Sequence, residues 1–134
     1  MADRINQMSE EFGKHNFSFM PKTFVLPKEF WQCKECMDKE KRFWIVKPAG
    51  SSQGKGIFIT CDSADLDDVK DENLTVSYYI SNPLTIDSLK FDLRIYVAIT
   101  SINPLRIYMH EEGLVRFATE RYEPPNPDCK TELN

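Results

Sequence analysis

Long hydrophobic runs and an excess of basic residues are both missing from this chain of 134 residues. No apolar stretch approaches the ~18 residues that a membrane-spanning helix requires, and the first residues lack the apolar core of a secretory signal. Lys and Arg number 17 against 21 Asp and Glu, which gives a net charge of −4. A nucleic-acid module would carry a basic surface. The composition therefore predicts a cytoplasmic protein that binds neither nucleic acid nor membrane.

Metal and disulfide patterns are also poorly represented. The four cysteines include one Cys-x-x-Cys pair, Cys33 and Cys36, but the other two do not form a second pair at zinc-ribbon spacing. The two histidines add no recognisable ligand set. At helical spacing Cys33 shares an apolar face with Phe30 and Met37. We therefore expect these cysteines to pack in the core, and we assign no metal ligand.

Glycine is scarce, yet three of the five glycines fall in one short loop, at Gly50, Gly54 and Gly56. Glycine admits positive φ and close backbone approach, and successive N–H groups can then form a concave anion site. Lys47 precedes this loop and Lys55 lies in it, both suited to phosphate. The spacing matches neither a P-loop nor a dinucleotide fingerprint. The pattern indicates strand, phosphate-covering loop and strand, or alternatively a hairpin with a solvated turn.

A second group of charged residues lies on an alternating stretch. Lys90, Asp92 and Arg94 alternate with apolar residues, so a period of two places the three charges on one face of a strand. Such a face could be a solvated ladder of cross-strand pairs. The functional interpretation is a cleft wall for a polyphosphate, with Asp92 orienting the two cations.

Five short motifs occur in an order that resembles the tubulin tyrosine ligase-like family of ATP-grasp amino-acid ligases. The motifs are residues 44–48, the loop to residue 56, and residues 79–84, 90–94 and 113–119. The resemblance covers residues 17–122 and is greatest to the polyglutamylases. It implies an α+β fold, a partial ATP-grasp in which a small sheet carries the glycine-rich nucleotide loop and precedes the first strands of a larger antiparallel sheet. This partial ligase core at 17–122 would follow a polar arm at 1–16 and precede a proline-rich tail at 123–134.

The resemblance also implies roles for individual residues. It assigns nucleotide binding to Lys47, Gln53, Gly54, Ser77, Tyr78, Tyr79, Ile80, Lys90, Phe91 and Asp92. Lys47 would contact the ATP phosphates, and the backbone of residues 77–80 would meet the adenine edge. Arg94 is assigned as the catalytic residue. Arg116 would hold the carboxylate of the incoming amino acid, because a planar guanidinium matches a planar carboxylate.

The function implied by the resemblance is that of an ATP-dependent carboxylate–amine ligase of the tubulin polyglutamylase type. A side-chain carboxyl of tubulin would be activated as an acyl phosphate and then attacked by the amine of free glutamate. Tubulin or microtubules are the expected partners, and the cytoskeleton, including a cilium or basal body, is the expected location. A tubulin glycylase or tyrosine ligase stays open as an alternative, as does a catalytically incomplete nucleotide- or tubulin-binding module.

Three departures from the family pattern qualify these expectations. Gln53 stands where many members carry arginine, and Ser77-Tyr78 stands where Gln-Arg is common. The family's later metal-binding segment has no counterpart here, so ligands for Mg²⁺ are expected downstream of this chain. Phosphoryl transfer depends on metal ions that neutralise developing charge. We therefore expect the chain, as a truncated piece, to be inactive alone.

Hydrophobic patterning predicts the elements that would carry these residues. A helix is expected at 28–39, and the acidic run 62–72 is expected to be a connection opened by an Asp or Ser cap. Strands are expected at 23–26, 44–46, 57–60, 75–80, 89–100, 105–110 and 114–118.

Overall fold

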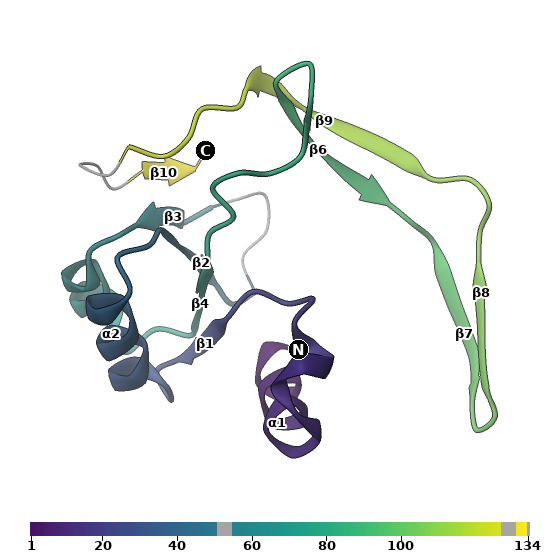
Figure 1. The fold of residues 1–134 in the computed structure, drawn as a ribbon, viewed down its shortest axis with the longest axis horizontal. Helices are drawn as coiled ribbons and strands as arrows, with labels where there is room; N and C mark the ends of the chain where they lie inside the picture. Colours follow the sequence, from purple (N-terminus) through teal and green to yellow (C-terminus); the bar gives the residue numbers. More distant parts are fainter. Residues whose placement is uncertain (51–54, 127–130, 134) are drawn as a thin grey trace. The chain divides into compact units, whose positions relative to one another are not determined.

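The computed structural model describes residues 1–50, 55–126 and 131–133. The chain forms two compact units, unit 1 from residues 1–81 and 125–134 and unit 2 from residues 82–124 (Figure 1). The elements follow in the order α1 (Ala2–Phe12), η1 (Lys14–Phe17), β1 (Thr23–Leu26), α2 (Phe30–Lys39), β2 (Trp44–Pro48), β3 (Ile57–Thr60), η2 (Ser63–Val69), β4 (Leu74–Tyr78), β5 (Thr85–Ile86), β6 (Leu89–Arg94), β7 (Val97–Ile102), β8 (Leu105–Met109), β9 (Leu114–Arg121) and β10 (Thr131–Leu133).

Unit 1 is built on a five-stranded sheet in the order β1-β4-β2-β3-β10. Every pairing in it is antiparallel. Side chains alternate between the two faces of a strand, and in β2 this turns Trp44 and Val46 toward α2 and leaves Lys47 exposed on the opposite face. One face of the sheet is therefore the core face, and the other carries Lys47, the residue expected to bind phosphate.

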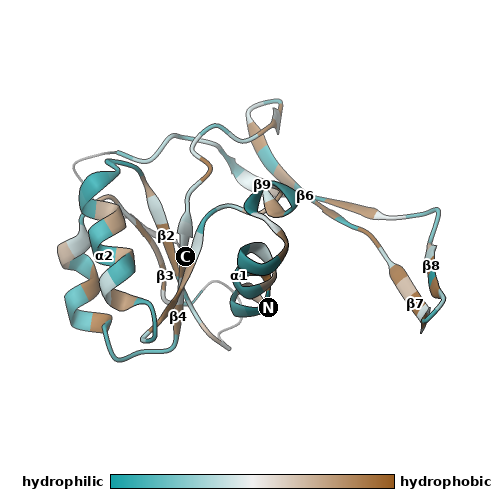
Figure 2. Cartoon of the chain, turned by 60° about the horizontal axis from the view of Figure 1, so that its bottom comes forward, coloured by the Kyte–Doolittle hydropathy of each residue, from teal (hydrophilic) through white to brown (hydrophobic). Residues whose placement is uncertain are grey.

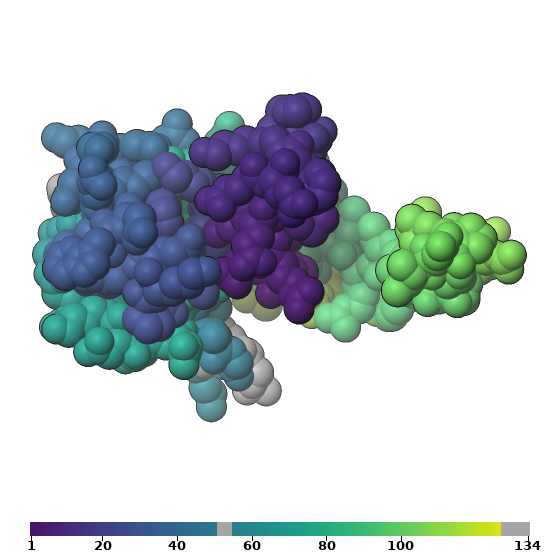
Figure 3. Space-filling view, turned by 90° about the horizontal axis from the view of Figure 1, so that it is seen from below, coloured from purple at the N-terminus to yellow at the C-terminus, as the bar shows by residue number. Residues whose placement is uncertain are grey.

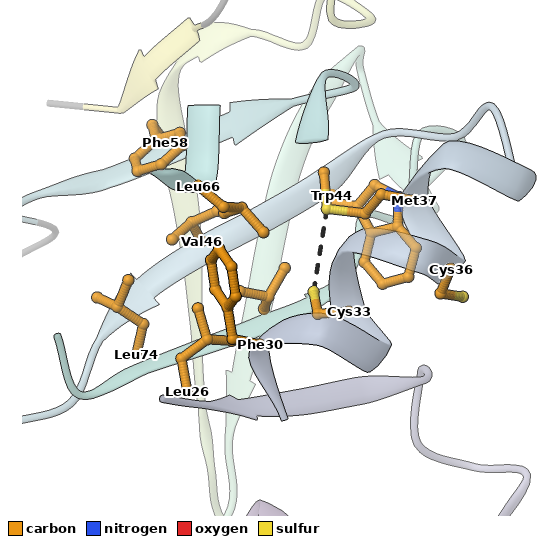
Figure 4. Packing of buried hydrophobic residues seen from close by; sticks show 11 residues of the cluster. Leu26, Phe30, Cys33, Cys36, Met37, Trp44, Val46, Phe58, Leu66 and Leu74 are labelled. Atoms are coloured by element: carbon orange, nitrogen blue, oxygen red, sulfur yellow. Dashed lines mark hydrogen bonds between the residues drawn. The ribbon is translucent and has the colours of Figure 1, made fainter. Parts of the chain in front are cut away.

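The core of unit 1 lies between α2 and this sheet (Figure 4). Its fully buried side chains include Trp44, whose ring lies 4.4 Å from that of Tyr78. The helix contributes Phe30, Cys33, Cys36 and Met37. The prediction that the apolar face of this helix packs in the core is confirmed, and Cys36 belongs to that face as well.

Side-chain hydrogen bonds fix two connections of unit 1, the turn before α2 and the acidic segment that begins η2. The helix predicted at 28–39 begins two residues later, at Phe30, because a turn intervenes in which Glu29 binds Val25 through both its backbone N–H and its carboxylate. The expected cap of the acidic run is confirmed: the Asp62 carboxylate accepts a hydrogen bond of 2.9 Å from Ala64 N at the start of η2.

Helix α1 is attached to unit 1 by polar contacts. It buries no residue, and Figure 2 shows it largely in the colour of hydrophilic residues. The Asn6 amide donates to the Thr23 carbonyl at 2.9 Å, and Asp3 pairs with Lys28 at 2.9 Å. In Figure 3 the residues of α1 accordingly lie against the segment that carries β1 and α2. None of the helices in the described residues has the length and apolar character to cross a membrane.

Unit 2 consists of a three-stranded sheet, β5-β6-β9, and the β7–β8 hairpin. The turn between β5 and β6 places Asp87 at φ 52° and Ser88 at φ 65°, the pair of positive values that a two-residue hairpin turn requires. The expectation of one strand at 89–100 is wrong. β6 ends at Arg94 and pairs with β9, whereas β7 begins at Val97 and pairs with β8. The strand is interrupted between Arg94 and Val97 because its pairing partner changes there from β9 to β8. The alternating sequence carries no signal for that change of partner.

The segment expected to be a proline-rich tail, 123–134, includes a strand. Residues 131–133 form β10, which pairs antiparallel with β3 and extends the sheet of unit 1. This pairing joins residues far apart in sequence, and the prolines that precede it conceal the strand.

Alkaline pH is expected to destabilise unit 1 through one buried group, Cys33, and one partly buried group, Tyr78. Burial raises the pKa of the Cys33 thiol from its ordinary 9.0 to about 12. Burial, aided by a hydrogen bond to Glu40, raises the pKa of Tyr78 to about 12. A raised folded-state pKa means that stability is complete below the unfolded pKa and is lost as pH rises through the folded value. The free energy of unfolding should then fall as pH rises above about 9, by up to about 1.4 kcal/mol per pH unit for each proton involved.

Denaturant unfolding followed by circular dichroism, at a series of pH values across this window, measures the effect. Cys33→Ala should make the decline with pH shallower. Cys61→Ala, which replaces an exposed cysteine, is the matched control and should keep the dependence of the parent chain. An unchanged slope in Cys33→Ala would contradict the role assigned to the buried thiol.

Candidate functional site

Lys47 stands near the end of β2 on the face of the sheet opposite α2. Its register partner on β4 is Thr75, whose hydroxyl donates to the Lys47 carbonyl at 3.4 Å. Within residues 1–50, 55–126 and 131–133 no ion pair holds its ammonium. The side chain is exposed, so its charge is presented to solvent where the glycine loop begins.

The glycine loop has the backbone that the sequence predicts where the structure describes it. Gly50 lies at φ 83° and Gly56 at φ 72°. A Cβ on Gly50 would meet no atom of the described residues within 4 Å, whereas one on Gly56 would lie 3.1 Å from the Pro48 ring. Gln53 and Gly54, predicted to lie over the nucleotide, are outside the described residues. The described part of the loop thus satisfies the conformational requirement for close anion approach.

The predicted adenine linker, residues 77–80, divides between a strand and the segment that follows it. Ser77 and Tyr78 belong to β4, between β1 and β2. The Tyr78 N–H donates to the Lys22 carbonyl and the Tyr79 N–H to the Phe43 carbonyl, each at 2.9 Å. Two of the expected backbone donors are therefore engaged within unit 1. Ile80 lies beyond the strand and is 61 % exposed.

The side chain of Tyr78 points to the core face of the sheet. Its ring packs on Trp44, and its hydroxyl donates a hydrogen bond to the Glu40 carboxylate. The hydrogen bond from Tyr78 is also the largest cause that lowers the pKa of Glu40. These contacts place the ring on the side opposite Lys47, so its side chain has a structural role.

In unit 2 the carboxylate of Asp92 binds Arg116 directly across the β6–β9 pair. Arg116 Nε lies 2.8 Å from Asp92 Oδ1, and Nη2 lies 2.5 Å from Oδ2. The Arg116 hydrogen bond is the main cause that holds the pKa of Asp92 below its ordinary value, and the charge of Arg94 adds to it. The Asp92 carboxylate therefore already occupies the Arg116 guanidinium, which the family resemblance assigns to the carboxylate of the incoming amino acid.

The other candidates in unit 2 lie on the same two strands or beside them. The Lys90 ammonium lies 4.5 Å from the centroid of the Tyr122 ring. Phe91 packs beside Phe117 of β9 with their ring centroids 6.0 Å apart. Arg94, at the end of β6, is exposed. Among the described residues, no group of three or more His, Cys, Asp or Glu side chains could hold a metal ion, and we assign no Mg²⁺ ligand to them.

Sequence reasoning missed one group of polar side chains in unit 1, on the core side of the sheet. Lys22, Cys36 and Glu40 contact one another, and Glu40 also accepts a hydrogen bond from the Tyr78 hydroxyl. The spacing of Cys36 in α2 and Glu40 just after it, four residues apart, was a visible signal for part of it. The approach of Lys22 depends on long-range pairing and leaves no trace in the sequence.

Comparison with known proteins agrees with these features. The sequence profile described as the Tubulin-tyrosine ligase family matches residues 1–133. Tubulin polyglutamylase TTLL5 of Mus musculus is 41% identical over 129 residues, which are 96% of this chain and 10% of that protein. Probable tubulin polyglutamylase TTLL2 of Homo sapiens is 41% identical over 133 residues, covering 94% of this chain and 22% of the relative. Tubulin monoglutamylase TTLL4 of Mus musculus is 42% identical over 121 residues, which are 90% of this chain and 10% of that protein.

A solved structure supports the fold. The C-terminal domain of Pby1 from K. lactis, described as an ATP-grasp enzyme interacting with the mRNA decapping enzyme Dcp2, matches 97% of this chain and 41% of that chain with a TM-score of 0.63. At 19% sequence identity this is a likeness of fold alone. It confirms the α+β, partial ATP-grasp architecture expected from the sequence.

Proposed function

This chain belongs to the tubulin-tyrosine ligase family, and on that premise we propose that it forms the nucleotide-binding part of an ATP-dependent ligase that adds glutamate to tubulin. The observation that carries the proposal is the identity shared along most of this chain with relatives named tubulin polyglutamylases and monoglutamylase. Tubulin or microtubules and free glutamate are then the substrates, and the microtubule cytoskeleton is the place of action. A cilium or basal body is a proposed site of that kind.

The residues of unit 1 suit the phosphates of ATP. Lys47 offers an exposed ammonium at the start of the loop, and the open side of Gly50 leaves room for an anion beside the backbone. ATP, when bound, supplies the phosphoryl group that activates the carboxylate. In unit 2 we propose that Lys90, Phe91 and Asp92 bind the nucleotide and that Arg94 acts on the reacting groups.

Arg116 suits the carboxylate of the incoming amino acid. Its fork already holds a carboxylate, that of Asp92, in two-point geometry, and this supports the proposal because bidentate recognition of a carboxylate uses the same geometry. Both side chains are more than half exposed, so a competing carboxylate can reach the guanidinium. We propose that glutamate takes the place of Asp92 on Arg116, which frees Asp92 for the nucleotide.

The test places this chain in a working enzyme. In mouse tubulin polyglutamylase TTLL5 the 129 matching residues are replaced by those of this chain, and glutamate incorporation into microtubules is measured. The chimera should be active. Lys47→Ala in the chimera should raise the KM for ATP roughly tenfold, because one charge-assisted phosphate contact is lost.

The control is Lys39→Ala, since Lys39 lies on α2 in an exposed pair with Glu35. It should leave the KM for ATP unchanged. A folded but inactive chimera that still binds ATP by calorimetry would favour a nucleotide-binding module over a ligase. Equal ATP constants for Lys47→Ala and Lys39→Ala would remove Lys47 from the site.

A further inference from the structure

A compact polar group lies where the last turn of α2 meets β1 and β4. The Lys22 ammonium is 2.8 Å from the sulfur of Cys36 and 3.3 Å from Glu40 Oε1. The Cys36 thiol in turn donates to Glu40 Oε1 at 3.4 Å. One sulfur therefore has a cation on one side and a carboxylate that can accept its proton on the other.

Neighbouring groups hold this arrangement in place. The Tyr78 hydroxyl donates to the Glu40 carboxylate, and Arg42 Nε lies 3.9 Å from the same carboxylate. The Lys22 ammonium also lies 5.6 Å from the centroid of the Phe24 ring. The hydrogen bond with Cys36 is the largest cause that raises the pKa of Lys22, so this lysine is an ammonium in the resting site and has a proton to give. The carboxylate and the cation beside the thiol are thus both positioned by partners of their own.

These three groups have the parts of an activated nucleophile. A nucleophilic side chain is activated by a base within hydrogen-bond reach that a third group orients, and a thiol beside a lysine is a known setting for reactive cysteines. Glu40 is the base, Tyr78 orients it, and Lys22 supplies positive charge where negative charge develops on sulfur. None of these groups has that task in the ligase reaction proposed above.

The neighbouring Cys33 gives an internal contrast. It is 0% exposed, its thiol points to the Met37 sulfur at 3.9 Å, and burial raises its pKa to about 12. Cys36 is 9% exposed, and in Figure 4 its sulfur points away from Cys33 and Trp44. The two cysteines of the Cys-x-x-Cys pair therefore have different environments: the thiol of Cys33 contacts another sulfur, whereas the thiol of Cys36 contacts an ammonium and a carboxylate.

We propose that Cys36 is a modification site, a thiol that hydrogen peroxide oxidises to sulfenic acid with the help of Glu40 and Lys22. The thiol proton passes to the Glu40 carboxylate while sulfur attacks one peroxide oxygen. An S–O bond forms and the O–O bond breaks, and the departing hydroxide takes a proton from Lys22 to leave as water. Return of the Glu40 proton to Lys22 restores the site. Sulfur is oxidised by two electrons and the peroxide is reduced, so thiol and hydrogen peroxide give sulfenic acid and water.

The experiment uses the full chain carrying Cys129→Ser, which removes the cysteine outside the described residues. Hydrogen peroxide is added with dimedone, which traps sulfenic acids, and peptide mass spectrometry follows labelling at each cysteine. Cys36 should label faster than Cys61, although Cys61 is exposed and Cys36 is not. Cys33 should label last.

Lys22→Gln should slow labelling of Cys36 about tenfold, since it removes one charge-assisted contact to sulfur, and should leave Cys61 unchanged. Lys34→Gln is the matched control, because Lys34 lies on α2 with Cys36 but pairs with Asp67 at 2.7 Å instead of contacting the thiol. Glu40→Gln, which keeps the shape and removes the base, gives a second readout. The proposal would be overturned if Cys61 were labelled faster than Cys36. It would also be overturned if Cys36 were labelled at the same rate in the Lys34→Gln control as in the folded Lys22→Gln or Glu40→Gln chain.

Discussion

Replacement of Trp44 by alanine is expected to lower the free energy of unfolding of unit 1 by about 3–5 kcal/mol. The side chain is 0% exposed and packs between Phe24 and Tyr78, with ring centroids 5.8 Å and 4.4 Å away. Its removal leaves a cavity between α2 and the sheet as well as the loss of buried apolar area. Chemical denaturation followed by circular dichroism measures the change.

The chain provides its own controls for this prediction. Trp31 is 76% exposed and contacts Phe30 alone among the aromatic rings of the described residues, so Trp31→Ala should cost no more than about 1 kcal/mol. The Trp44 indole N–H has no hydrogen-bond partner within the described residues. Trp44→Phe should therefore cost less than Trp44→Ala, because it fills much of the space and removes an unsatisfied donor. Equal losses for Trp31→Ala and Trp44→Ala would refute the importance assigned to Trp44.

Arg116→Lys, made in the active chimera, is expected to raise the KM for glutamate roughly tenfold, because it keeps the charge but loses the two-point fork. The KM for ATP should change little, provided that binding limits both constants. Steady-state incorporation of labelled glutamate at varied glutamate and ATP concentrations gives both values. This experiment tests the amino-acid role of Arg116 apart from any nucleotide role.

Asp92→Asn should shift the two constants in opposite directions. It weakens the internal carboxylate that competes for Arg116, so the KM for glutamate should fall. It also removes a charged group assigned to the nucleotide, so the KM for ATP should rise. Asp92→Asn and Arg116→Lys therefore form an informative pair. If Arg116→Lys raises the ATP constant alone, Arg116 serves the nucleotide and the exchange of carboxylates is excluded.

Local patterns in the sequence predicted much of the site's framework. A strand at 44–46 that leads to Lys47 and the glycine loop is present as β2, and the glycines at 50 and 56 adopt the positive φ expected of them. The helical spacing of Cys33 and Met37 correctly predicted a buried face. Each of these features depends on residues close together in the chain, where periodicity and backbone preference are informative.

Features set by distant partners were not predictable in the same way. The register of β6 against β9 gives Asp92 its partner Arg116, whereas the alternating pattern alone indicated a role with Lys90 and Arg94. The end of β6 at Arg94 reflects a change of strand partner. The approach of Lys22, the residue before β1, to Cys36 of α2 depends on how the two elements pack.

Strand β10 has a topological consequence. A backbone nick at Asn103-Pro104, in the turn between β7 and β8, would divide the chain into a piece carrying β1 to β7 and a piece carrying β8 to β10. Each sheet would then be shared, because β8 pairs with β7, β9 with β6 and β10 with β3. The two pieces would stay associated through three separate sets of backbone hydrogen bonds. The pairing of β10 with β3 thus links the C-terminal piece to the sheet of unit 1 without a covalent bond. This makes the chain suited to division into two fragments that reassemble.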